Sequence, residues 1–185
     1  MSAAMFEGWH EFYLMAGGAA AVLIGLIFVV ISLMQDRPRS SVLAGTRLYM
    51  GPIVLGVSFV MLLSAAALIP GMTPREFSAL SGAVALWGLA RGLMSSVGIG
   101  RLHEVHWTDF WFYGVFPSLL YIALGGIALA MWQGWPRADD ALAAFVTAGL
   151  LLAIRNEWDL ITWITPRGDD GEHSFRSTRE MKRSP

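Results

Sequence analysis

Apolar residues along this chain come in five long blocks separated by short polar stretches. The blocks lie at about 11–34, 47–69, 77–100, 109–132 and 140–164. Each is close to the roughly 20 residues that a helix needs to cross a hydrocarbon core about 30 Å thick. The alternation typical of a membrane β-barrel is missing. The pattern predicts an all-α integral membrane protein, a compact bundle of five transmembrane helices.

Helix signals fall between the blocks. Thr73, Pro74 and Glu76 match the N-cap, N1 and N3 positions of a capping box, so we expect the third helix to begin there. Residues 166–185 are polar, carry alternating charge and show no apolar period. The chain therefore divides into a transmembrane domain at 1–165 and a tail at 166–185 that we expect to be disordered and cytoplasmic.

The positions of Lys and Arg outside the blocks indicate the orientation, because positively charged loops stay on the cytoplasmic side. With the N-terminus outside, the cytoplasmic side carries nine of these residues: Arg37, Arg39, Arg47, Arg101, Arg167, Arg176, Arg179, Lys182 and Arg183. The external side then carries only Arg75 and Arg137. We therefore expect an outside N-terminus and a cytoplasmic C-terminus.

Composition and charge narrow the classes of function. Hydrophobic residues make up 55% of the chain and charged residues 15%, against about 25% charged residues in soluble proteins. A net charge of -1 offers no basic face for phosphates, so no nucleic-acid partner is expected. The absence of cysteine excludes disulfides and thiolate catalysis. Hydrolase and nucleotide-binding motifs are also missing, so the sequence predicts no cofactor and no catalytic residues.

Charged residues are predicted to meet in the inner third of the bilayer. Arg91 and Arg155 each lie about 22 Å along a helix that starts outside, and Asn156, Glu157 and Asp159 follow Arg155 directly. Arg155 and Asp159 are four apart and share a face. Glu157 points elsewhere, so we expect Arg91 to pair with a carboxylate and to lock the third helix to the fifth. A cluster that only fixes helix register and a functional site both stay open.

Small residues recur on two of the predicted helices. Gly17, Ala21 and Gly25 are spaced by four in the first, and Gly88 and Gly92 in the third. Helices in lipid associate through close backbone approach, which small residues permit. The spacing fits packing within one bundle, and it also fits a subunit interface or a narrow pore between copies.

Two further groups of polar residues could bind ions. His103, His106 and Asp109 would roughly align on a helical turn and could hold a divalent metal near the inner face. Their spacing is not that of the H-E-x-x-H motif. Polar loop residues at an interface are the commoner explanation, so no metal is predicted. Glu7 and Glu11 could concentrate cations at an outer mouth, although the orientation rule also leaves acidic residues outside.

Two segments carry a family resemblance. The first block holds Phe12-Tyr13, Gly17-Gly18-Ala19-Ala20-Ala21, Leu23, Gly25-Leu26 and Phe28-Val29, and the last holds Asn156-Glu157-Trp158-Asp159-Leu160. These segments resemble the first and last helices of a family of small five-helix bacterial inner-membrane proteins. The resemblance implies a compact helical bundle in the bacterial inner membrane, and it implies no activity.

Three classes of function fit these observations. The first is passive transport by an oligomer, with the outer carboxylates and the inner charge cluster as candidate filters. The second is a non-catalytic accessory or regulatory subunit of a membrane protein complex. Less favoured is an intramembrane enzyme that uses the loop of His103, His106 and Asp109 with Glu157 or Asp159. The expected partners are the lipid bilayer and either further copies of the chain or another membrane protein.

Overall fold

The computed structural model describes residues 6–33, 51–100, 111 and 115–164, and this part of the chain is helical without strands. A short 3-10 helix, η1 (Glu7–Trp9), leads into α1 (His10–Leu33). The other helices are α3 (Gly51–Ala67), α4 (Pro74–Gly100), α6 (Phe116–Trp132) and α7 (Ala138–Ile164). The prediction of an all-α protein is confirmed for the described residues. The tail at 166–185 lies outside the described residues.

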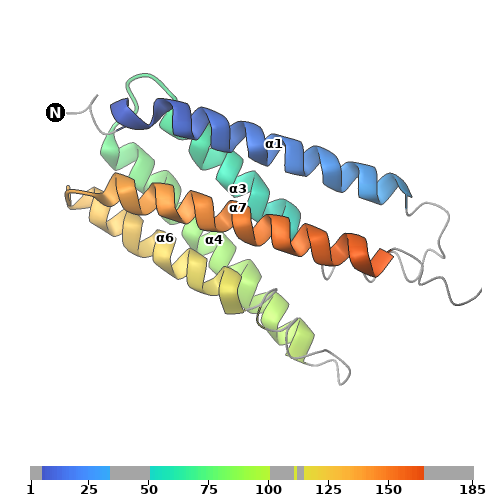
Figure 1. The fold of residues 1–185 in the computed structure, drawn as a ribbon. Coiled ribbons are helices and arrows are strands. Elements are labelled where there is room, and N and C mark those ends of the chain that lie inside the picture. Colours follow the sequence, from blue (N-terminus) through green and yellow to red (C-terminus); the bar gives the residue numbers. More distant parts are fainter. Residues whose placement is uncertain (1–5, 34–50, 101–110, 112–114, 165–185) are drawn as a thin grey trace, which may run out of the picture.

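The five α-helices form an up-and-down bundle (Figure 1). The connections at 68–73 and 133–137 lie at the end of the bundle where α1 begins, and we call it the N-terminal end. The helices pack as two main pairs, α1 against α3 and α4 against α6. The last helix, α7, joins these pairs because it contacts α1, α3 and α6. Among the described helices, α3 likewise contacts three others, α1, α4 and α7.

The N-terminal end is closed by aromatic rings and by helix caps. The ring of Phe6 lies 5.6 Å from that of Tyr13 and 4.8 Å from that of Phe77, centroid to centroid, which ties α1 to α4. At the start of α4, the backbone N–H and hydroxyl of Thr73 both donate to a carboxylate oxygen of Glu76, at 2.9 Å. The predicted capping box is therefore confirmed.

Helix lengths agree only in part with five spans. Two of the described helices are long and apolar enough to cross a membrane, over His10–Ser32 and Pro74–Met94. The apolar helices α3 and α6 have 17 residues each, about 25 Å. The predicted blocks at 47–69 and 109–132 also include residues outside the described part of the chain. Although α7 has 27 residues, it carries charged residues at both ends.

Candidate functional site

Two buried rows of side chains on α7 end in polar residues. One row contains Val146, Ala153 and Glu157, and the other contains Phe145 and Asn156. Residues three or four apart share a face of a helix, so each polar side chain continues an apolar row. Glu157 is 7% exposed and Asn156 is 5% exposed. The end of the bundle opposite the N-terminal end therefore holds a carboxyl and an amide in its core.

The carboxyl of Glu157 is incompletely hydrogen-bonded. Its Oε1 atom is buried and has no hydrogen-bond partner among the described residues. The same holds for the hydroxyls of Tyr13, Ser64 and Ser81, but those groups are neutral. A buried carboxylate costs far more free energy than a buried hydroxyl unless it is paired or takes up a proton. Among the described residues, Glu157 is thus the one carboxyl with a buried oxygen atom that lacks a hydrogen-bond partner.

Asp159 and Arg155 form an ion pair beside this carboxyl. Nη1 of Arg155 lies 2.6 Å from Oδ2 of Asp159, and the two side chains are 37% and 38% exposed. Arg155 also donates to Oδ1 of Asn156 at 3.5 Å. The predicted pairing at four-residue spacing is confirmed, and it occupies the charge of Arg155 without engaging Glu157.

The predicted pairing of Arg91 with Glu157 or Asp159 does not form in the structure. Arg91 is exposed on α4, and the described residues include no salt bridge to it. The reason is the arrangement of helices, because α4 packs mainly against α6 and, less extensively, against α3. The four-residue charge cluster is therefore reduced to Arg155, Glu157 and Asp159 on α7, with Asn156 between them in sequence.

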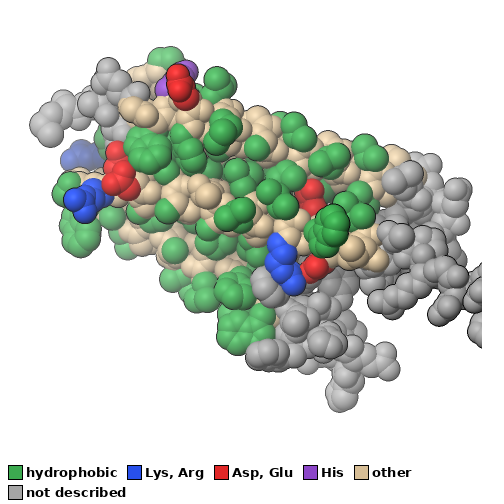
Figure 2. All heavy atoms as spheres, in the orientation of Figure 1, with side chains coloured by type: hydrophobic (Ala, Val, Ile, Leu, Met, Phe, Trp, Pro, Cys, Tyr) green, Lys and Arg blue, Asp and Glu red, His purple; other side chains and the backbone are tan. Residues whose placement is uncertain are grey.

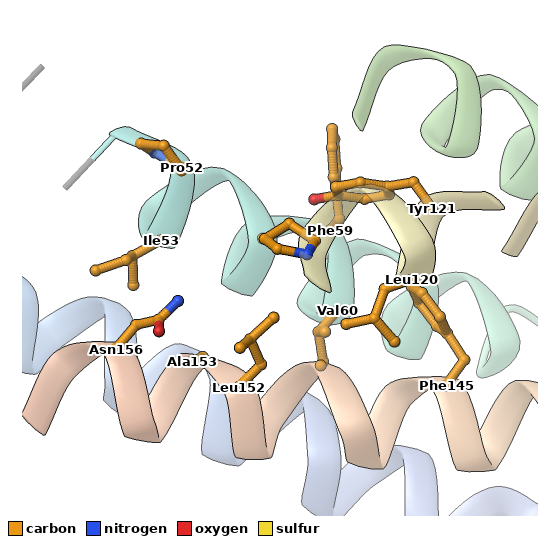
Figure 3. A pocket seen from close by; sticks show the side chains of 13 residues that line it. Pro52, Ile53, Phe59, Val60, Leu120, Tyr121, Phe145, Leu152, Ala153 and Asn156 are labelled. Carbon is orange, nitrogen blue, oxygen red and sulfur yellow. The ribbon is translucent and has the colours of Figure 1, made fainter. Parts of the chain in front are cut away.

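A cavity of about 50 Å³ lies between α3, α6 and α7 (Figure 3). Asn156 and Ile53 lie toward one end of its lining and Tyr121 and Phe145 toward the other, with Val60 between them. A water molecule needs roughly 10–15 Å³ of such space and two or more polar partners. The cavity is large enough for a few waters beside Asn156. Sequence analysis did not identify Tyr121, because one tyrosine inside an apolar block carries no distinguishing signal.

Glycines on α4 serve packing within the bundle. A Cβ atom at Gly88 would overlap the ring of Tyr121 on α6. A Cβ atom at Gly92 would lie 2.8 Å from Oγ of Ser118, also on α6. A side chain at Gly88 would require the Tyr121 ring to shift, whereas one at Gly92 would require the Ser118 hydroxyl to rotate away. The structure thus supports the first interpretation of these two residues, close contact of helices within one chain.

The three small residues spaced by four on α1, Gly17, Ala21 and Gly25, do not all face the same environment. A Cβ atom at Gly17 would lie 3.3 Å from Cβ of Ser64 on α3, whereas one at Gly25 would have no neighbour within 4 Å. Ala21 and Gly25 are exposed. Each step of four residues turns about 40° around a helix with 3.6 residues per turn. The predicted stripe therefore winds from the α3 contact to the outer surface.

The remaining candidates are only partly described. Glu11 is exposed at the start of α1, whereas the side chain of Glu7 lies outside the described residues. So do His103, His106 and Asp109, and the metal hypothesis is not tested. Among the described residues, no group of three or more His, Asp or Glu side chains could hold a metal ion.

No protein-family model, curated protein or solved structure matches this chain. The resemblance to the bacterial inner-membrane family therefore stays a prediction.

Proposed function

We propose that this chain is a five-span integral membrane protein of the bacterial inner membrane, with its N-terminus outside. Its surface supports this. On α1 the exposed fractions are 61% for Leu14, 65% for Met15, 63% for Val22 and 64% for Phe28. Large apolar side chains are rarely left in contact with water over a continuous surface, but they are well solvated by lipid. The bacterial location rests on the family resemblance alone.

The positions of charge also support insertion in a membrane. The N-terminal end of the bundle carries Glu11, Arg75, Glu76, Arg137, Asp139 and Asp140, and the opposite end carries Arg91, Arg155, Glu157 and Asp159. Figure 2 shows apolar side chains covering one face between these two ends. The uncharged stretches at 77–90 on α4 and 141–154 on α7 are each about 21 Å long. This band would occupy most of the hydrocarbon core.

The activity that we propose is passive transport of protons, with Glu157 as the group that takes up and releases the proton. The buried, incompletely hydrogen-bonded carboxyl of Glu157 carries the proposal. An ionisable residue at membrane depth is costly, which makes a functional role the default interpretation. A buried site of this kind tolerates the protonated, neutral carboxyl but not the charged carboxylate. The charge of Glu157 therefore changes each time it takes up or releases a proton.

The cavity lined by Asn156, the residue before Glu157, favours protons over larger ions, although Glu157 itself is not part of its lining. The cavity beside Asn156 holds about 50 Å³, which is enough for a few waters but not for an ion with its hydration shell. Protons need only a chain of waters and exchangeable groups, such as the carboxyl of Glu157. The ion pair of Arg155 and Asp159, which is partly exposed, adds polar groups at the same level of α7, on a different face from Glu157.

Proton flux in proteoliposomes tests the activity. Vesicles containing the protein and a trapped pH-sensitive dye are given a potassium diffusion potential, and the internal pH is followed. We expect Glu157→Gln to reduce the flux to that of empty vesicles, because an amide cannot exchange a proton. Glu157→Asp should retain part of the flux. The matched control, Asp140→Asn, removes a carboxylate from the exposed start of the same helix and should leave the flux unchanged.

Two outcomes contradict the proposed activity. One is flux through the unmodified protein no faster than through empty vesicles. The other is equal flux through the unmodified protein and Glu157→Gln at equal amounts of correctly inserted protein. Sedimentation of the vesicles with the protein distinguishes both outcomes from a failure of insertion.

A second candidate function is that of an accessory subunit in a membrane protein complex. One observation favours it, an open apolar groove on the surface between α4 and α6. A groove of this kind accommodates a helix from another chain. Identifying the occupant of the groove separates a partner protein from a second copy of the same chain.

A further inference from the structure

The groove between α4 and α6 has a volume of about 560 Å³ and opens to the surface of the bundle. Its lining includes Ala79, Gly82 and Leu86 from α4, and Gly126, Leu129 and Trp132 from α6. A Cβ atom added at Gly82 or at Gly126 would meet no other atom within 4 Å. The glycines therefore leave backbone accessible in an apolar groove, and this is the surface against which helices pack closely in lipid.

The opposite side of the bundle presents a ridge that suits such a groove. Leu14, Gly18, Val22 and Gly25 are exposed on α1, and their spacing places them on one face. A Cβ atom at Gly18 or at Gly25 would also be free of contacts within 4 Å. Figure 1 shows α1 on one side of the bundle and the α4–α6 pair on the other. One chain therefore carries both surfaces, facing away from each other.

Charges at the N-terminal end match between the two surfaces. Glu11 is exposed at the start of the α1 ridge. Arg75 is exposed at the start of α4, and its guanidinium carbon lies 6.0 Å from the ring centroid of Trp132, which lines the groove. Copies inserted in one membrane share one orientation, and α1 and α4 both begin at the N-terminal end. Glu11 of one copy would thus lie at the depth of Arg75 in the next.

The same register aligns the small residues. Gly18 follows Glu11 by seven residues and Gly82 follows Arg75 by seven, so both lie about 10 Å further into the membrane. Val22 and Leu86 come four residues later on each helix. Parallel helices in this register would bring glycine opposite glycine directly below an ion pair. A phospholipid would also fill the groove, and its phosphate would pair with Arg75, but its binding would not depend on Glu11.

We propose that the groove between α4 and α6 binds α1 of a second copy of this chain, with Glu11 beside Arg75 and Gly18 against Gly82. The two surfaces differ, so the contact is head-to-tail, and successive copies close into a ring if the rotation permits. The inference rests on the proposed insertion in a membrane and is independent of proton transport by Glu157.

Cross-linking between two differently tagged copies tests the contact. The chain has no cysteine, so each introduced thiol is unique. One copy carries Val22→Cys and the other Leu86→Cys, and native membranes that contain both are treated with copper phenanthroline. We expect a disulfide-linked heterodimer as the main product. The matched control replaces Leu86→Cys by Thr147→Cys, an exposed position on α7, and should give none.

Charge reversal at Glu11 and Arg75 distinguishes loss of the specific contact from a failure of the protein to fold. Glu11→Arg alone and Arg75→Glu alone should each reduce the yield of the heterodimer several-fold, because like charges then meet. Copies that carry both changes should recover it. Three outcomes would each overturn the proposal. The reversals leave the yield of heterodimer unchanged, Val22→Cys links equally well to the Thr147→Cys control, or the groove thiol links only to another protein. If the protein sediments with membranes and no heterodimer forms, the proposed contact is wrong while the proposed membrane insertion stands. Recovery of the protein in the soluble fraction would overturn both the contact and the membrane insertion.

Discussion

Replacing Gly88 by leucine is expected to separate α4 from α6 and to cause the largest loss of stability of any single change considered for this chain. The first carbon of any side chain at this position would overlap the ring of Tyr121. Relief of the overlap must move that ring out of its edge-on contact with Phe59 of α3, where the ring centroids lie 6.0 Å apart. Forcing extra carbons into a packed contact costs about 1–3 kcal/mol, and we expect the upper end of that range here because the overlap already begins at Cβ. For a chain of this length, that corresponds to a fall of roughly 6–12 °C in melting temperature.

Thermal unfolding in mild detergent, followed by size-exclusion chromatography, measures this loss. Ala90→Leu is the matched control, because Ala90 lies two residues further along α4 and is exposed. It should leave the melting temperature nearly unchanged. Adding Tyr121→Ala to Gly88→Leu should recover part of the loss, since the smaller side chain removes the overlap. A melting temperature for Gly88→Leu equal to that of Ala90→Leu would contradict the packing of α4 on α6.

Replacing Glu157 by leucine is expected to raise the stability of the bundle while it abolishes proton flux. The substitution removes a buried carboxyl whose Oε1 atom has no hydrogen-bond partner among the described residues. It also extends the apolar row that contains Val146 and Ala153. Removing an unsatisfied buried polar group stabilises a fold by about 1–3 kcal/mol, or roughly 2–12 °C in melting temperature.

The sign of this change distinguishes a functional carboxyl from a structural one. If Glu157 holds helices together through a partner, Glu157→Leu leaves that partner unsatisfied and lowers the melting temperature. If Glu157 is retained for proton exchange, its removal relieves a cost that the fold otherwise bears. Asp140→Leu serves as the control, because Asp140 is exposed at the start of the same helix. A fall in melting temperature specific to Glu157→Leu would contradict the proposed role.

The helices themselves could be predicted from the sequence because their causes are local. Long apolar blocks fix the positions of α1, α4 and α7 to within a few residues. The capping box of Thr73 and Glu76 needs only four consecutive residues, and it forms as expected. Likewise, the ion pair of Arg155 and Asp159 depends on spacing along one helix. Each of these features is decided within a few turns of the chain.

Contacts between helices could not be predicted in the same way. The expected partner of Arg91 lay on α7, but α4 packs chiefly against α6. The spacing of charges along the chain does not indicate which helices become neighbours. Gly17 and Gly25 likewise share a spacing but not an environment, because one faces α3 and the other faces outward. Neither the cavity beside Asn156 nor the groove over Gly82 has a sequence signal of its own.

Single-cysteine labelling most directly tests the central claim, a bundle that spans the membrane with its N-terminal end outside and its C-terminus inside. Because the native chain has no cysteine, one thiol at a time can be introduced at Met72, at Gln133 or at Ser174. Intact spheroplasts are exposed to a membrane-impermeant maleimide, and the labelled fraction is compared with that after permeabilisation. We predict that Met72→Cys and Gln133→Cys are labelled in intact spheroplasts, and that Ser174→Cys is labelled only after permeabilisation. Labelling of Ser174→Cys from outside, or protection of Met72→Cys and Gln133→Cys until permeabilisation, would contradict the proposed topology.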